Sequence, residues 1–356
     1  MSQVFALGVT ESHKQLQLIS IPRREVGPSD VHIQVEYCGI CHSDVHHCRQ
    51  EWGETKKPSV PGHEIIGKVT QVGAQVSKFK VGDSVGVGCL VDSCRECKQC
   101  GDSTVQYCAK GAIQTYGSPS NDATGHTMGG YSQAMVVDEA FVLSIPANLD
   151  PAAAAPLLCA GVTVWSPMKH YGVKAGSKIA VLGLGGLGHM AVKFASKMGA
   201  HVTVLSRSES KRQQALALGA ESVLITSDAD AFNAARSTFE FVLDTIGDEH
   251  DLGAYMDLLG VDGTYIMVGA SPKPLALSVF SLIMKRIKIG GSLVGSIKET
   301  QEMLDFCGEH GIVSDVEVVK AEYVEKAWER VLKSDVKFRF VIDVAGSLNA
   351  DTVVQV

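Results

Sequence analysis

The sequence predicts an α/β protein of two domains, in which a β-rich segment precedes a doubly wound parallel sheet. Its 356 residues exceed what one hydrophobic core usually supports. Residues 1 to about 150 contain short runs of valine and isoleucine separated by Gly-Asp and Pro-Gly turns. From about residue 155, strand and helix patterns alternate. This alternation is typical of a parallel sheet covered by helices on both faces.

The composition is that of an ordinary globular protein, with 45% hydrophobic and 20% charged residues. The formal net charge of -7 argues against a nucleic acid or an anionic membrane as partner. The start "MSQVFALGVTESHK" lacks the pattern of a secretory signal, and the longest apolar stretch, "PAAAAPLLCAGVTVW", is too short for a membrane span. We therefore expect a cytoplasmic protein, whose ten cysteines are metal ligands or free thiols rather than disulfides.

The first segment contains four β-like runs, which we expect to form a curled β-domain because turn residues separate them. They are "DVHIQVEYCGI" (30–40), "GKVTQVG" (67–73), "GDSVGVGC" (82–89) and "YSQAMVV" (131–137).

Four cysteines crowd into the next stretch, with the spacing C-x2-C-x2-C-x7-C: Cys94, Cys97, Cys100 and Cys108. A bacterial ferredoxin run has its fourth cysteine after three residues and before proline, whereas here it comes after seven and Ala109 follows. Thiolates at such spacing suit a tetrahedral zinc ion, and no position is left open for a substrate. The pattern predicts a structural zinc site; the alternative is a set of unliganded thiols on a loop.

The second segment alternates strands and helices and then returns to a helix and two further β-like runs. In chain order these runs are 177–182, 189–200, 201–206, 210–219, 221–226, 240–246, 252–260, 263–270, 298–311, 316–320 and 338–346.

A glycine pattern opens the second segment. Gly183, Gly185 and Gly188 form G-x-G-x-x-G after a strand, and Gly186 and Leu187 begin the helix that follows. In this context the turn lets backbone N–H groups approach a pyrophosphate, which predicts dinucleotide binding. A merely close-packed strand–helix turn is the alternative.

The end of the next strand determines which dinucleotide binds. NAD enzymes place a carboxylate there, but this chain has Ser206, with Arg207, Ser208 and Lys211 beside it. Hydroxyls and cations suit a 2'-phosphate, so we predict NADP; the alternative is a solvated helix start. Glu209 is expected at a helix N-terminus, where the helix dipole favours its charge.

A second metal site is suggested by Cys41, His63 and Cys159. Two cysteines and a histidine with an open position are a known ligand set of catalytic zinc. Spacing alone does not link these three residues, since each is more often a plain buried residue.

Seven motifs together resemble the zinc-dependent medium-chain alcohol dehydrogenases, and especially their cinnamyl alcohol dehydrogenase branch. They span nearly the whole chain in order: "GICHSD", "PGHE", the four-cysteine lobe, "PLLCAGVTVWSP", "GLGGLGHMAVKFA", "IGGSLVGSIKETQEML" and "FRFVIDVAGSL". The resemblance implies a GroES-like catalytic domain over 1–157 with 297–356, and a Rossmann NADP-binding domain over 158–296. It also implies a homodimer, with a strand near "IKIGGSLVG" pairing across the two-fold axis.

The resemblance assigns the catalytic zinc to Cys41, His63 and Cys159, with Glu64 next to it either as an occasional ligand or as a group that contacts the ligands. Asp44 is expected to steady His63 through its far ring nitrogen. The four-cysteine lobe is expected to hold a structural zinc that takes no part in the chemistry.

The resemblance further implies a proton relay and a cofactor contact. Ser43 accepts the proton of the alcohol and passes it through a ribose hydroxyl to His46, while Thr163 contacts the nicotinamide side. The function implied is hydride transfer between an alcohol or aldehyde and NADP(H).

Substrate residues are less defined. Trp52 is expected to line the pocket, because its loop precedes "VPGHE"; the alternative is that it fills the core. Plant cinnamyl enzymes carry aromatic residues where this chain has Ile113 or Gln114, and Leu293. These departures favour a broad primary alcohol and aldehyde enzyme. The alternatives are a polyol dehydrogenase and a non-catalytic, zinc-containing nucleotide-binding relative.

Overall fold

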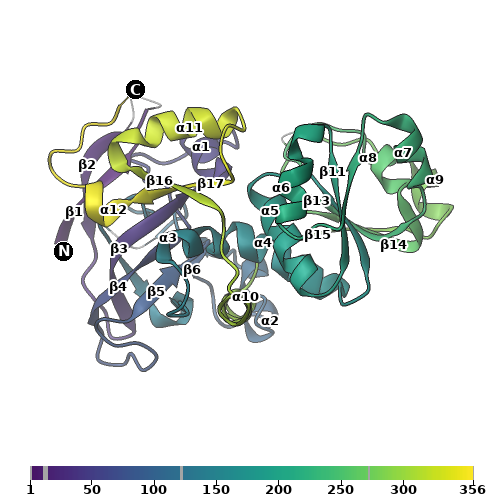
Figure 1. The fold of residues 1–356 in the computed structure, drawn as a ribbon. Helices are drawn as coiled ribbons and strands as arrows, with labels where there is room; N and C mark the ends of the chain where they lie inside the picture. Colours follow the sequence, from purple (N-terminus) through teal and green to yellow (C-terminus); the bar gives the residue numbers. More distant parts are fainter. Residues whose placement is uncertain (1, 11–14, 121–122, 272, 356) are drawn as a thin grey trace. The chain divides into compact units, whose positions relative to one another are not determined.

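The computed structural model describes residues 2–10, 15–120, 123–271 and 273–355. The chain divides into two compact units (Figure 1). The first, here called the β-rich unit, combines Met1–Cys159 with Ser296–Val356. The second, the parallel-sheet unit, is Ala160–Gly295. The β-rich unit is therefore built from both ends of the chain.

The β-rich unit contains a seven-stranded sheet in the order β16-β17-β3-β4-β5-β9, with β8 also paired to β3. Two smaller sheets pair β1 with β2 and β6 with β7. The strands are β1 (Ser2–Gly8), β2 (Gln17–Arg23), β3 (Asp30–Ile40), β4 (Ile65–Val72), β5 (Ser84–Val87), β6 (Leu90–Asp92), β7 (Ile113–Gln114), β8 (Ala134–Asp138), β9 (Leu143–Ser144), β16 (Val316–Lys320) and β17 (Arg339–Asp343).

Strand β3 organises this sheet. Its first half pairs with β8 and its second half with β17, while β4 runs along its other edge. The strand ends at Ile40, directly before Cys41, and β4 begins at Ile65, directly after His63 and Glu64. Since β3 and β4 are antiparallel neighbours, the end of one lies beside the start of the other. The sheet thus brings two of the predicted ligand segments together.

Short helices surround this sheet: α1 (His42–Cys48), α2 (Lys98–Gly101), η1 (Val105–Tyr107), η2 (Glu139–Phe141), α3 (Pro151–Ala154), η3 (Ala155–Leu158), α10 (Ile297–His310), η5 (Ala321–Tyr323), α11 (Val324–Leu332) and α12 (Val344–Ser347). The longest, α10, begins with a capping box between Ser296 and Glu299 and ends at Gly311 in the left-handed conformation.

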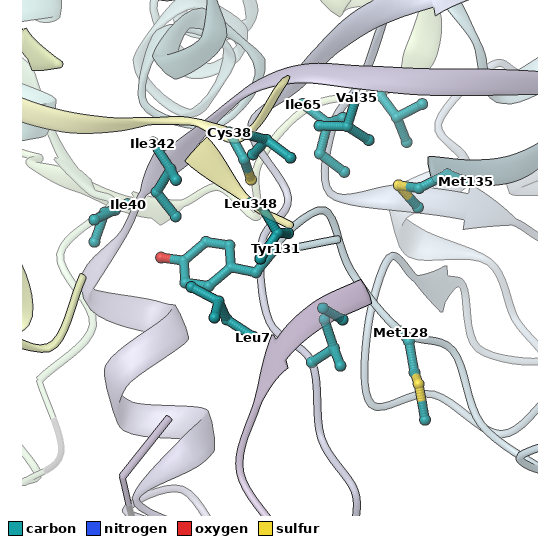
Figure 2. Close-up of a cluster of buried hydrophobic side chains, with 14 of the residues drawn as sticks. Leu7, Val35, Cys38, Ile40, Ile65, Met128, Tyr131, Met135, Ile342 and Leu348 are labelled. Carbon is teal, nitrogen blue, oxygen red and sulfur yellow. The ribbon is translucent and has the colours of Figure 1, made fainter. Parts of the chain in front are cut away.

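The core of the β-rich unit joins side chains that are distant in the sequence. Figure 2 shows Tyr131 with Leu7 from β1, and with Ile342 and Leu348 from the C-terminal segment nearby. Tyr131 is fully buried and its hydroxyl accepts a hydrogen bond from the indole of Trp328. Full burial of a large apolar side chain stabilises a fold by roughly 1.5–3 kcal/mol. The C-terminal segment is therefore an integral part of this unit.

The parallel-sheet unit has six parallel strands in the order β12-β11-β10-β13-β14-β15. Helices α5 and α6 cover one face of the sheet, and α7 and α8 cover the other (Figure 1). This arrangement confirms the predicted doubly wound sheet, whose strand order reverses between β10 and β13. Its elements are α4 (Ala160–Tyr171), β10 (Lys178–Leu182), α5 (Gly186–Lys197), β11 (His201–Ser206), η4 (Glu209–Lys211), α6 (Arg212–Ala217), β12 (Ser222–Ile225), α7 (Ala229–Ala234), β13 (Phe239–Asp244), α8 (Leu252–Met256), β14 (Leu259–Met267), α9 (Val279–Ile283) and β15 (Lys288–Gly291).

Within the described ranges, no single helix is long and apolar enough to span a membrane. Only the bent pair Pro151–Leu158 and Ala160–Tyr171 passes on joint length and composition.

Candidate active site

Four buried side chains of the β-rich unit form a candidate metal centre. Cys41, His63, Glu64 and Cys159 each offer one ligand atom, and these atoms all lie within 4.8 Å of one another. Cys41 is the N-cap of α1, His63 and Glu64 immediately precede β4, and Cys159 immediately follows η3. Three chain segments therefore converge on one point.

Asp44 holds this cluster in place. Its carboxylate is fully buried, and Oδ1 lies 3.3 Å from Nδ1 of His63. The backbone N–H groups of Cys41 and Gly62 donate to the same carboxylate, at 2.8 and 3.0 Å. With Nδ1 engaged, Nε2 of His63 faces the cluster, 3.1 Å from Sγ of Cys159. A carboxylate behind a ligating histidine fixes its tautomer and orientation.

Glu64 and Arg339 form a buried ion pair, with Nη2 of Arg339 3.2 Å from Oε1 of Glu64. Arg339 also donates to the carbonyl of Ile40. Burial raises the pKa of Glu64 to about 8, although Arg339 and His63 both oppose that rise. Apart from this ion pair, no group of the described residues donates a hydrogen bond to either carboxylate oxygen. Such oxygens suit a metal ion, whose charge would favour the ionised carboxylate.

The donor set fits zinc, since thiolates, an imidazole and a carboxylate are all zinc ligands. The buried thiols of Cys41 and Cys159 interact, which holds the pKa of Cys41 well below its ordinary value and that of Cys159 well above it. A thiolate is the form that binds metal. The centre can therefore hold zinc with Cys41, His63 and Cys159, and Glu64 lies within reach.

Three residues that lie around this centre were not predicted from the sequence: Arg339, Tyr116 and Cys89. Arg339 is a charged residue at the start of β17, directly before the apolar residues 340–342, and the sequence itself contains this contrast. Tyr116 is buried, and its ring centroid lies 5.5 Å from that of His63. Cys89 is partly buried, and its Sγ lies 3.9 Å from the carbonyl oxygen of Leu158, the residue before Cys159.

The predicted relay residues both lie on α1. Oγ of Ser43 is 3.5 Å from Sγ of Cys41. His46 follows one turn later; its Nδ1 contacts the carboxylate of Glu51, and its ring lies 4.9 Å from that of Trp52. The imidazole is 28% exposed, so it can exchange protons with water.

The predicted substrate residues lie in different places. Trp52 is half exposed and lines a cavity of about 340 Å³ with His47, Gln114 and Tyr116. Ile113 instead lines another cavity, of about 780 Å³. Adjacent strand residues point to opposite faces, so Gln114, rather than Ile113, is beside Trp52.

Two further predicted residues belong to the parallel-sheet unit. Thr163 is buried in α4, whereas Leu293 is about half exposed shortly after β15.

The four-cysteine lobe forms the second candidate metal centre. The sulfur atoms of Cys94, Cys97, Cys100 and Cys108 lie within 4.8 Å of one another, and none of the chain's ten cysteines forms a disulfide. The backbone N–H of Ala109 donates to Cys97 at 3.4 Å and is the largest cause lowering the pKa of that thiol to about 6. Four thiols with backbone donors around them fit a closed zinc site.

The glycine turn between β10 and α5 has the shape of a phosphate cradle. Gly183 has φ +92, and a β-carbon at Gly188 would lie 2.1 Å from the carbonyl oxygen of Gly183. A β-carbon at Gly185 would meet nothing within 4 Å. Gly185 is the N-cap of α5 and has no side chain, so no capping side chain competes for the first amides of the helix, at Gly186 and Leu187. These features fit a pyrophosphate at the helix N-terminus.

The segment after β11 is compact. The hydroxyl of the buried Ser206 donates to the carbonyl of Ser208 and accepts from its N–H. Lys211 donates to the carbonyl of Leu184 at 3.1 Å, which ties this segment to the glycine turn. Burial lowers the pKa of Lys211, and the nearby Arg207 lowers it further.

Glu209 pairs with Arg212 and begins η4, as a helix N-terminal acid would. The end of β11 therefore carries the hydroxyl of Ser206 and not a carboxylate.

Comparison with known proteins identifies the family of the chain. The profile of the alcohol dehydrogenase GroES-like domain matches residues 27–147, and that of the zinc-binding dehydrogenase domain matches residues 186–309. The chain is 49% identical to NADP-dependent alcohol dehydrogenase C of Mycobacterium tuberculosis, covering 97% of this chain and 99% of that protein. It is 52% identical to a mannitol dehydrogenase of Petroselinum crispum, covering 92% and 98%.

Among solved structures, the chain is similar to a cinnamyl alcohol dehydrogenase of Helicobacter pylori complexed with NADP(H). The TM-score is 0.90 at 40% identity, covering 97% of this chain and 99% of that chain.

Proposed function

The chain belongs to the zinc-dependent alcohol dehydrogenase family, and we propose that it interconverts primary alcohols and aldehydes with NADP(H). The observation that carries this proposal is the convergence of Cys41, His63 and Cys159 next to the buried Glu64. Non-catalytic zinc-containing relatives of the fold have no need of such a centre.

The residues of the β-rich unit have distinct roles in this proposal. When bound, zinc supplies a Lewis acid for the alcohol or carbonyl oxygen, and NADP(H) supplies the hydride chemistry. Cys41, His63 and Cys159 hold the ion, Asp44 orients His63, and Glu64 adds a negative charge balanced by Arg339.

The proton of the alcohol needs an acceptor. Ser43 is suited to receive it, since its hydroxyl lies beside the ligand Cys41. His46, one helical turn further and partly exposed, is suited to deliver the proton to water. A positioned acid–base group of this kind contributes roughly 10²- to 10⁴-fold to the rate.

The preference for NADP(H) is proposed to depend on Ser206, Arg207, Ser208 and Lys211. Two charge-assisted hydrogen bonds of roughly 1.5–3 kcal/mol each would favour NADPH by about 10²- to 10⁴-fold. We expect Ser206→Asp to reverse much of this preference, because a carboxylate repels the 2'-phosphate and accepts from a ribose diol. The measurement is kcat/KM with each cofactor at saturating aldehyde. Equal use of NADH and NADPH by the wild type would contradict the assignment.

We propose a broad range of primary alcohols, both aromatic and aliphatic. The relatives carry different substrate names, and the cavity beside Trp52 and Gln114 combines apolar and polar walls. A polyol is the second candidate, because the mannitol dehydrogenase is 52% identical. A panel of cinnamyl, benzyl and aliphatic alcohols with mannitol, and the matching aldehydes with NADPH, separates the two.

We also propose a homodimer in the cytoplasm. Strand β15 is an edge of its sheet, and α9 exposes Val279, Phe280 and Ile283 close before it in the chain. Apolar edges of this kind need covering. Unpaired cysteines suit a reducing compartment. A stable, active monomer by light scattering at micromolar concentration would contradict the dimer.

A further inference from the structure

A buried polar cluster in the parallel-sheet unit lies outside both metal centres. It joins Asp244, at the end of β13, to His250 and Tyr265. Oδ2 of Asp244 lies 2.8 Å from Nε2 of His250 and 3.1 Å from the hydroxyl of Tyr265. The three side chains are almost completely buried, with that of His250 8% exposed. Burying polar side chains costs free energy unless their hydrogen bonds are satisfied. A satisfied buried network is rigid and holds its members in one specific geometry.

His250 closes the loop that follows β13. Its Nδ1 donates to the carbonyl of Asp248 at 2.8 Å, while its Nε2 reaches back to Asp244. The other carboxylate oxygen of Asp244 accepts from the N–H of Ile246 at 2.9 Å. The imidazole of His250 thus contacts both Asp244, at the start of the loop between β13 and α8, and Asp248, in the middle of this loop.

This loop packs directly against the glycine turn. The hydroxyl and the N–H of Thr245 both bond to the carbonyl of Leu182, at 2.8 and 3.1 Å. A β-carbon at Gly183 would lie 3.0 Å from that hydroxyl. On its other side, a β-carbon at Gly269 would lie 2.1 Å from the carbonyl oxygen of Ile246.

The loop between β13 and α8 therefore packs between the turn after β10 and the end of β14. Strands β10 and β13 are the neighbours at which the strand order reverses, where doubly wound sheets bind ligands.

We propose that His250 is a positioning residue of the dinucleotide site. By holding the loop Thr245–Asp248 against the glycine turn, it fixes the wall that faces the pyrophosphate and nicotinamide half of the cofactor. The inference rests on the proposed function, because it takes NADP(H) as the ligand of this turn. His250 itself is not assigned a contact with the cofactor.

The test compares two ligands in solution with the full-length protein. NADPH occupies both ends of the site, whereas adenosine 2',5'-bisphosphate probes only the segment around Ser206–Lys211. We expect His250→Gln to weaken NADPH binding by about tenfold or more (roughly 1.4 kcal/mol). Binding of the bisphosphate should change by less than about twofold. Fluorescence titration gives both dissociation constants, and a thermal melt reports stability separately.

His201→Gln is the matched control, since His201 forms an exposed pair with Glu221 in the same unit. It should leave both constants unchanged. Tyr265→Phe removes one donor to Asp244 but keeps the loop bonds, so its effect on NADPH should be smaller than that of His250→Gln.

Two outcomes would overturn the inference: unchanged NADPH binding in His250→Gln, or equal weakening of both ligands, which indicates general destabilisation. Failure of the wild type to bind NADPH would instead refute the proposed function. If His250→Gln does not fold, Thr245→Val loosens the same loop at Leu182, and the same unequal effect on the two ligands is expected.

Discussion

The two cysteine centres of the β-rich unit offer the same sulfur ligands in opposite surroundings. The four-cysteine lobe draws its ligands from one short stretch, three of them only partly buried, with a backbone N–H supporting Cys97. The other centre draws Cys41, His63 and Cys159 from three segments and buries them with Asp44, Glu64 and Arg339.

Under the proposed function, zinc has a different role in each place. Four thiolates close the first coordination shell, so the ion can only hold the lobe together. Three ligands with a buried carboxylate nearby leave room for a substrate and set the charge around it. A comparison of matched variants in the two centres separates these roles.

The largest effect is expected from Cys159→Ser. Loss of a ligand should lower kcat by more than the roughly 10- to 100-fold that loss of an outer-shell partner costs. Cys159 is not among the side chains of the main hydrophobic cluster of the β-rich unit, and the dinucleotide turn lies in the other unit, so NADPH should still bind. Steady-state kinetics and NADPH titration check both points. Retained turnover would show that Cys159 is not a ligand.

Cys100→Ser is expected to act on folding instead. Structural zinc contributes roughly 10–16 kcal/mol of ligation free energy in zinc peptides, and losing one thiolate forfeits a sizeable part of it. The midpoint of thermal unfolding should fall clearly, with little soluble protein recovered. If the Cys100→Ser protein has normal stability but has lost turnover, the four-cysteine lobe takes part in the chemistry. That result would contradict its assignment as the structural centre.

A smaller effect is expected from the arginines that accompany each centre. Arg339→Met leaves Glu64 buried without its counter-ion, which should lower the free energy of unfolding by about 3–5 kcal/mol. Arg95→Met is the control in the four-cysteine lobe, where Arg95 forms surface ion pairs with Asp92 and Asp138. Surface pairs contribute about 0–1 kcal/mol. Urea unfolding of both variants measures the difference, and equal losses would contradict it.

The two centres also differ in how far the sequence could predict them. Cys94 to Cys108 lie close together in the chain, so their spacing alone indicates a metal. Cys41, His63 and Cys159 are linked only by the pairing of β3 with β4 and the position of η3, which no local pattern contains. A resemblance across the whole chain was needed to join them.

Local patterns predicted the parallel-sheet unit more fully than the side-chain contacts within it. The alternation of strands and helices and the glycine turn are both present as expected. The bond from Lys211 to Leu184 depends on side-chain directions. In the β-rich unit, the position of Gln114 rather than Ile113 beside Trp52 depends on them too. The Asp244–His250 link depends on how a loop folds back, and its residues have no distinctive spacing.

The zinc content of the wild type and of the two cysteine variants tests the central claim most directly. We expect two zinc ions per chain in the wild type, and one in Cys159→Ser protein that remains folded, binds NADPH and has lost turnover. One ion or none in the wild type, or two ions in an inactive Cys159→Ser variant, would contradict the assignment of separate structural and catalytic centres.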